Sequence, residues 1–172
     1  MKITDLDTTE YAPYQASYIA GVSDEYTLTE ELEISLHNFI KFVQDIPMAK
    51  HDYRYAEGKW TIKDIIQHVI DCERVFSYRA LRFSRNDTTE LPGFDENSYA
   101  NAASADKRTI KDLLTELSAL RHGNIFLFKS FSAEDFMKKG VASGHTVSVR
   151  AFGFLIIGHQ NHHIKIFKER YL

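Results

Sequence analysis

The sequence predicts an all-α protein, an up-down bundle of four long helices, and three observations lead to that prediction. Four segments of roughly 18–24 residues carry apolar side chains at three- and four-residue spacing, the pattern of helices with one buried face. The three prolines, Pro13, Pro47 and Pro92, all lie outside these segments. No pair of strands with a hairpin signal stands out.

The four helices are expected at about residues 28–45, 62–83, 110–130 and 148–170. The first three begin with a capping pattern, a threonine followed three positions later by an acidic side chain: Thr27 with Glu30, Thr61 with Asp64, Thr109 with Asp112. The fourth follows a Gly144-His-Thr turn, and the β-like letters HTVSV are interpreted as turn and helix entry. Helices of this length suit a bundle whose histidine-bearing faces turn inward.

The remaining segments are expected to cover the bundle rather than to form a second domain, so residues 1–172 are predicted to be one domain. The first 26 residues are expected to lie extended across the helices. Residues 86–107 form the longest connection, a crossover at which a lid or a dimer contact would sit.

Composition excludes several classes of function. A formal net charge of −3 provides no clustered basic surface for nucleic acid. The sequence contains no run of about 18 apolar residues, so no membrane span is predicted. The acidic N-terminus does not resemble a signal peptide. Cys72 is the single cysteine, so no intrachain disulfide can form and a reducing, cytoplasmic setting is predicted.

The histidines carry the clearest chemical signal. His159 and His163 are four residues apart, a spacing that places two imidazoles on one helix face where they can share an ion. His162 lies close in angle, so the helix alone does not decide which pair binds. His68 lies among apolar residues of the second helix and is expected to face the bundle interior. Together these residues would supply three nitrogen ligands and leave positions open, as catalytic metals require.

The alternative is that these histidines are core polar residues that bind no metal. Near His68, Cys72 is interpreted as packing rather than as a ligand. Asp71 is the first candidate to accept a hydrogen bond from a ligand imidazole or to act as a general base. Glu73, rotated by about 140° from His68 on the helix, is expected to pair with an arginine. The arginine series is interpreted as a solvated face, with binding of a substrate anion as the alternative: Arg74, Arg79, Arg82 and Arg85.

Three motifs in order resemble the DinB/YfiT-like superfamily over about residues 11–172. They are GKWTIKDIIQHVIDCERVFSYRALRFSR, LPGFDENSYA and GHQNHHIKIFKER. The resemblance implies a four-helix bundle, commonly a homodimer, with a three-histidine site for one divalent ion. Zinc or nickel is expected first, with manganese or iron as alternatives. His68, His159 and His163 fall on the three ligand positions, and His162 becomes their neighbour.

The resemblance implies a metal-dependent hydrolase or a thiol transferase acting on a small electrophilic substrate, in the second case with a low-molecular-weight thiol as partner. The bound ion would act as a Lewis acid on water or thiol. Asp71 is the first choice as general base and Glu73 the second. The alternative is a non-catalytic, stress-related dimeric bundle whose metal or cavity serves stability or ligand storage.

Overall fold

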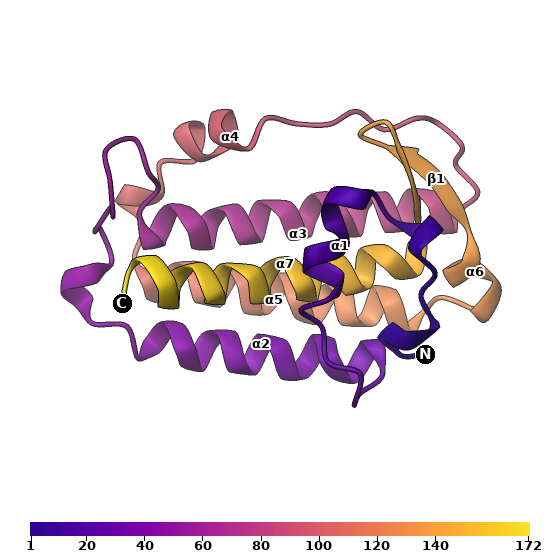
Figure 1. Ribbon diagram of the computed structural model, residues 1–172, viewed down its shortest axis with the longest axis horizontal. Helices are drawn as coiled ribbons and strands as arrows, with labels where there is room; N and C mark the ends of the chain where they lie inside the picture. The colour runs from indigo at the N-terminus through magenta and orange to yellow at the C-terminus, as the bar shows by residue number, and fades with distance from the viewer.

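The computed structural model describes residues 1–172 and contains four long helices packed side by side (Figure 1). They are α2 (Leu28–Gln44), α3 (Ile62–Ser84), α5 (Ile110–Lys129) and α7 (Val149–Arg170). Each begins and ends within one residue of its expected position, so the predicted four-helix bundle is confirmed.

The capping residues fix where these helices begin. The hydroxyl of Thr61 accepts a hydrogen bond from the amide of Asp64 at 3.1 Å, and the Asp64 carboxylate accepts one from the Thr61 amide at 2.9 Å. The hydroxyl of Thr109 likewise accepts a hydrogen bond from the amide of Asp112 at 3.1 Å. These bonds satisfy amide groups that the first helical turn leaves without a partner, which is why the boundaries could be predicted.

The long connection changes the direction in which the chain runs. Along α3 and α5, Gln67 bonds Arg108 and Arg74 bonds Glu116, so the two helices run parallel. Helix α7 runs opposite to α3, and α2 runs opposite to α5 (Figure 1). The helix directions are therefore down, up, up, down, and not the strict alternation of the expected up-down bundle, because the crossover returns the chain along the full length of the bundle before α5 begins.

The crossover carries α4 (Glu96–Ala103) and the 3-10 turn Ala105–Lys107, and passes along α3 (Figure 1). Leu91, near its start, exchanges two backbone hydrogen bonds of 2.9 Å with Val141 and Ser143. The crossover is thus attached to the segment between α5 and α7 at one end of the bundle.

That segment contains α6 (Ala133–Met137) and a hairpin that the sequence did not predict. Strands β1 (Lys139–Ala142) and β2 (His145–Ser148) pair antiparallel, with Ala142 opposite His145. Ser143 and Gly144 connect them, both with positive φ, 52° and 75°. Two such residues fit the tight two-residue turn that matches strand twist. The interpretation of HTVSV as turn and helix entry was therefore wrong.

The N-terminal segment is less extended than expected. It contains three 3-10 turns, Ile3–Asp5, Thr8–Glu10 and Pro13–Gln15, and the short helix α1 (Ala16–Ile19). Helix α1 packs directly on α7 at Gly158, where an added Cβ would lie 2.2 Å from the carbonyl oxygen of Tyr18. Only glycine permits this approach, which places Tyr18 beside His159.

The interior consists of two apolar clusters separated by a polar layer. One cluster contains the hairpin-side residues of α3 and α7, such as Phe83 and Phe152, and the other contains residues of the opposite end, such as Ile66 and Phe167. Buried polar side chains lie at the level between the clusters: Ser35, His68, Glu73, Arg121, Asn124, His159, Gln160 and His163. None of the helices has the length and low polarity needed to cross a membrane.

Candidate metal centre

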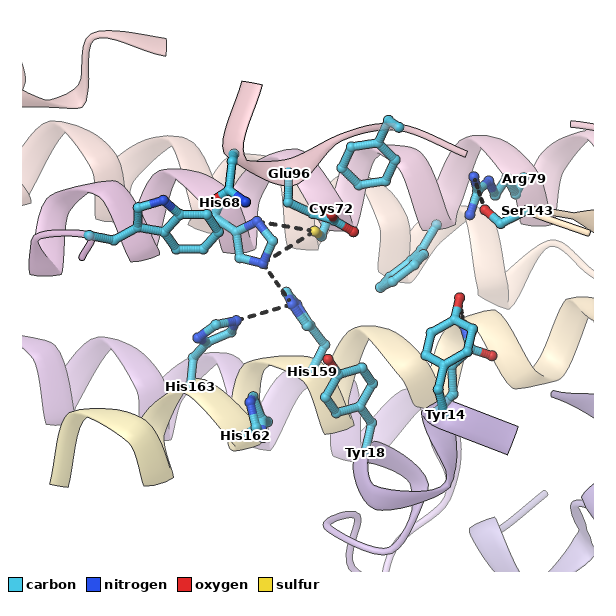
Figure 2. Close-up of a pocket in the computed structure, with 15 residues that line it drawn as sticks. Tyr14, Tyr18, His68, Cys72, Arg79, Glu96, Ser143, His159, His162 and His163 are labelled. Atoms are coloured by element: carbon cyan, nitrogen blue, oxygen red, sulfur yellow. Dashed lines mark hydrogen bonds between the residues drawn. The ribbon is translucent and has the colours of Figure 1, made fainter. Parts of the chain in front are cut away.

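Three imidazoles converge in the polar layer, His68 from α3 and His159 and His163 from α7 (Figure 2). The Nε2 atom of His159 lies 3.0 Å from Nε2 of His68 and 3.1 Å from Nε2 of His163. All three residues are less than one-tenth exposed. The structure therefore brings together the three histidines that the sequence singled out.

The contacts are not those of ordinary core histidines. A single imidazole nitrogen carries either one hydrogen or one lone pair, so Nε2 of His159 cannot form two good hydrogen bonds at once. None of the three rings bonds a carboxylate or a backbone carbonyl, and Nδ1 of His163 is buried without a partner. Three nitrogen atoms at these separations fit lone pairs directed toward a shared cation.

Burial also favours the protonation state that a metal requires. It lowers the pKa of His68 to about 4. It holds the pKa values of His159 and His163 well below their usual range, and the neighbouring imidazoles lower them further. All three rings are neutral at pH 7, with nitrogen lone pairs available to an ion.

Cys72 lies one helical turn after His68 and contacts it. Its Sγ atom is 3.6 Å from both ring nitrogens of His68, and the ligand atoms of His68, Cys72 and His159 lie within 4.8 Å of one another. This group could hold a metal ion. Burial raises the pKa of the Cys72 thiol above its usual range, so without a nearby cation the thiol stays protonated. In that protonated state Cys72 is a buried packing residue, as the sequence analysis interpreted it.

A cavity of about 330 Å³ lies against the imidazoles. Helices α3 and α7, the N-terminal segment and the crossover all contribute to it (Figure 2). The Tyr18 ring packs edge-on against the rings of His159 and His162 at 5.5 and 5.1 Å between centroids, and the Trp60 ring lies 4.7 Å from His68. The predicted crossover therefore does cover the site, through Phe94, Glu96 and Asn97.

The structure does not bring Asp71 to the imidazoles. Its Oδ1 atom accepts a hydrogen bond from Gln67 at 3.0 Å and lies 3.7 Å from Arg74, on a different side of α3. It lines a separate surface depression with these two residues. Contrary to the prediction from the sequence, Asp71 therefore neither bonds a ligand imidazole nor lies where a general base would act.

Glu73 behaves as the sequence predicted, because it pairs with an arginine. Arg121 donates to both of its carboxylate oxygens, at 2.7 and 2.9 Å, and Asn124 donates to one at 3.0 Å. The carboxylate that does line the cavity is Glu96, from the start of α4. Glu96 lies within the motif LPGFDENSYA, but its sequence position gave no sign that the crossover would fold over the histidines.

Arg79 departs from the expected solvated arginine face. Arg74 and Arg82 have side chains 47% and 26% exposed and form ion pairs, whereas Arg79 is 5% exposed and lines the cavity. A signal was available in the sequence, since Arg79 follows His68 by eleven residues. Eleven residues are slightly more than three helical turns, so the two side chains leave α3 in nearly the same direction.

Comparisons with known proteins identify the family of the chain and a shared fold. The family model described as the DinB superfamily matches residues 31–167. The chain belongs to the DinB superfamily. Among solved structures, this DinB-superfamily chain is similar to YfiT from Bacillus subtilis, described as a probable metal-dependent hydrolase with an unusual four-helix bundle topology. The TM-score is 0.75 at 17% identity, over 93% of this chain and 91% of that one, which shows a shared fold.

Two curated relatives of this DinB-superfamily chain are named as candidate metal-dependent hydrolases. One, from Bacillus cereus (strain G9842), is 27% identical over 156 residues, 87% of each chain. The other, from Bacillus pumilus (strain SAFR-032), is 30% identical over 121 residues, 67% of each chain. The match to the family model, over residues 31–167, includes His68, His159 and His163.

Proposed function

We propose that this protein is a metal-dependent hydrolase in which His68, His159 and His163 hold one divalent ion. The observation that carries the proposal is the convergence of three buried, neutral imidazoles on one point beside a cavity. The names of the two Bacillus relatives support the same reaction class.

The donor set fits a catalytic ion. Three nitrogen ligands leave at least one coordination position for water or substrate, whereas structural zinc sites are closed by four protein ligands. Imidazole nitrogen suits zinc and nickel, and we propose one of these as the physiological ion. When bound, such an ion polarises a substrate carbonyl and lowers the pKa of water to near neutrality.

The protein supplies the remaining groups around the ion. Burial raises the pKa of Tyr18, so its phenol keeps its proton and can donate a hydrogen bond to a substrate oxygen. Glu96 is the carboxylate that can accept a proton in the cavity, in the role first given to Asp71. The rings of Trp60, Phe76 and Phe94 limit the access of bulk water.

A second candidate is a structural, non-catalytic site in which Cys72 is the fourth ligand. The 3.6 Å contact of its sulfur with His68 favours this alternative, because a thiolate would close the coordination shell. The two candidates differ in what Cys72→Ala does. A catalytic His₃ site keeps its metal and its turnover in this variant, whereas a closed Cys–His₃ site loses metal and melting temperature.

The reaction class is tested with zinc- and nickel-loaded protein against a panel of aryl esters and amides, with a second arm that offers a small thiol and an electrophile. Hydrolysis that stops on chelation and returns with the ion supports the proposal. Turnover only in the thiol arm would identify a thiol transferase instead. Hydrolysis that continues at the same rate after metal removal would overturn it.

A further inference from the structure

A buried cation lies at the end of the cavity away from the imidazoles. Figure 2 shows Arg79 beside Ser143 at that end. Its Nη2 group donates to the carbonyl oxygen of Pro92 at 2.7 Å and to the Ser143 hydroxyl at 3.1 Å. Both acceptors are neutral. The hydrogens on Nη1 and Nε have no acceptor in the protein.

The lack of a carboxylate sets Arg79 apart from the other arginines with little exposure. Arg121 forms a bidentate pair with Glu73, and Arg150 forms one with Glu10. Glu96 lines the same cavity but forms no hydrogen bond with Arg79, and a buried charge without a bonded counter-charge is unfavourable. Burial accordingly lowers the pKa of Arg79, the direction expected of an uncompensated cation. A ligand that supplies the negative charge would remove this cost.

The position of Arg79 defines the shape of such a ligand. His68, Cys72, Phe76 and Arg79 follow one another along a single face of α3 and all line the cavity. Eleven residues of helix separate His68 from Arg79, an axial rise of about 16 Å. Between the two ends the wall contains the rings of Phe76 and Phe94 and the carboxylate of Glu96 (Figure 2). A molecule that reaches both ends is elongated, with a middle part that packs on the two rings.

We propose that Arg79 binds the carboxylate of the substrate. The substrate of the hydrolase proposed above, on which this inference rests, is then an elongated monocarboxylate whose hydrolysable bond lies at the end opposite the carboxylate. One carboxylate matches the single charge of Arg79, and its oxygens can accept from the free N–H groups. A doubly charged phosphate would leave one negative charge uncompensated.

The test compares hexanoate with hexanamide, which has the same shape without the charge, by calorimetric titration at pH 7.5. Both probes are titrated into protein as purified and into protein from which metal has been removed. Wild type is expected to bind hexanoate at least about tenfold more tightly than hexanamide in both forms. Arg79→Gln abolishes this preference, and Arg79→Lys keeps part of it because the charge remains. Arg82→Gln, on the same helix outside the cavity, keeps it in full.

Metal content, measured on the same samples, separates this inference from the metal proposal. Arg79→Gln is expected to hold as much metal as wild type. A carboxylate preference that survives in Arg79→Gln but disappears with the metal would mean that the probe binds the ion, and would overturn the role of Arg79. Equal affinities of the wild type for hexanoate and hexanamide would also overturn the role of Arg79, and this result does not depend on whether the variants fold. Tighter binding of inorganic phosphate than of hexanoate would overturn the monocarboxylate assignment.

Discussion

Arg121 donates a hydrogen bond from Nη2 to the side-chain oxygen of Gln160 at 2.8 Å, and Gln160 directly follows His159 in α7. The same guanidinium bonds both oxygens of Glu73, the carbonyl of Leu32 and the hydroxyl of Ser35. All five of its N–H groups are therefore satisfied. The amide of Gln160 also donates to the carbonyl of Ser35 at 2.8 Å. This network joins all four long helices next to the imidazoles.

Replacement of Arg121 by methionine is expected to lower the free energy of unfolding by about 3–5 kcal/mol, because Glu73 would remain buried without its cation. The double variant Arg121→Met, Glu73→Gln is expected to recover part of this loss, since it removes the unpaired charge. Urea denaturation measures both. A loss below about 1 kcal/mol in the single variant would contradict a network that holds the helices together.

The close packing of α1 on α7 leads to a second prediction. In Gly158→Ala the new Cβ would meet the Tyr18 carbonyl at 2.2 Å, so α1 must shift. Overpacking of this kind lowers stability by about 1–3 kcal/mol. Gly123→Ala is the matched control, because its Cβ meets nothing within 4 Å in α5. That variant is expected to gain up to about 1 kcal/mol from helix propensity. Equal effects of the two substitutions on melting temperature would contradict the packing at Gly158.

The pair formed by Glu10 and Arg150 predicts how stability depends on acid. Burial alone would raise the pKa of Glu10, but hydrogen bonds from Arg150, Asp7 and Ser148 outweigh it and lower the pKa to about 2. Because the pKa of Glu10 is lower in the folded state than its ordinary value of 4.5, the ionised carboxylate stabilises the folded state fully at pH values above 4.5. This contribution is lost as the pH falls toward 2. Glu10→Gln is therefore expected to cost about 2–3 kcal/mol at pH 6 and much less at pH 3.

Urea denaturation of wild type and Glu10→Gln across this pH range measures the difference. Glu33→Gln serves as the control, because Glu33 and its partner Lys129 are both about half exposed and such pairs contribute less than about 1 kcal/mol. If the cost of Glu10→Gln is the same at pH 6 and pH 3, the ion pair does not produce the acid sensitivity.

The two acidic residues discussed for catalysis make opposite predictions. Glu96 lines the cavity, so Glu96→Gln is expected to lower kcat of the proposed hydrolysis by about 10²–10⁴-fold, as loss of a general base does. Asp71 is bonded to Gln67 on another side of α3, so Asp71→Asn is expected to change kcat less than about threefold. The reverse order would restore Asp71 as the base and remove Glu96 from the reaction.

Those parts of the fold that depend on local signals could be predicted from the sequence. The four long helices were placed within one residue, because caps such as Thr61 with Asp64 and apolar periodicity act within one segment. The convergence of His68 with His159 and His163 could also be predicted, since buried faces of neighbouring helices must meet. The hairpin was missed because its strands have four residues each and the turn depends on Ser143 adopting a positive φ.

What the sequence did not provide was which residues of the covering segments line the cavity beside the histidines. Glu96 and Tyr18 line the cavity beside the histidines only because the crossover and α1 fold back over α3 and α7. Arg79 was grouped with arginines that are solvated, because its burial depends on Pro92 and Ser143 from two distant segments. Such contacts between segments far apart in the sequence leave no local signal, although the eleven-residue spacing does place Arg79 on the same face of α3 as His68.

The most direct test of the central claim is elemental analysis of purified, untagged protein after incubation with zinc or nickel and removal of free ion. Wild type, Cys72→Ala and the exposed-histidine control His122→Ala are expected to retain about one equivalent. His68→Ala, His159→Ala and His163→Ala are expected to lose most of it, with helical circular dichroism unchanged. One equivalent retained in all three histidine variants, or none bound by wild type, would contradict a metal centre formed by these imidazoles.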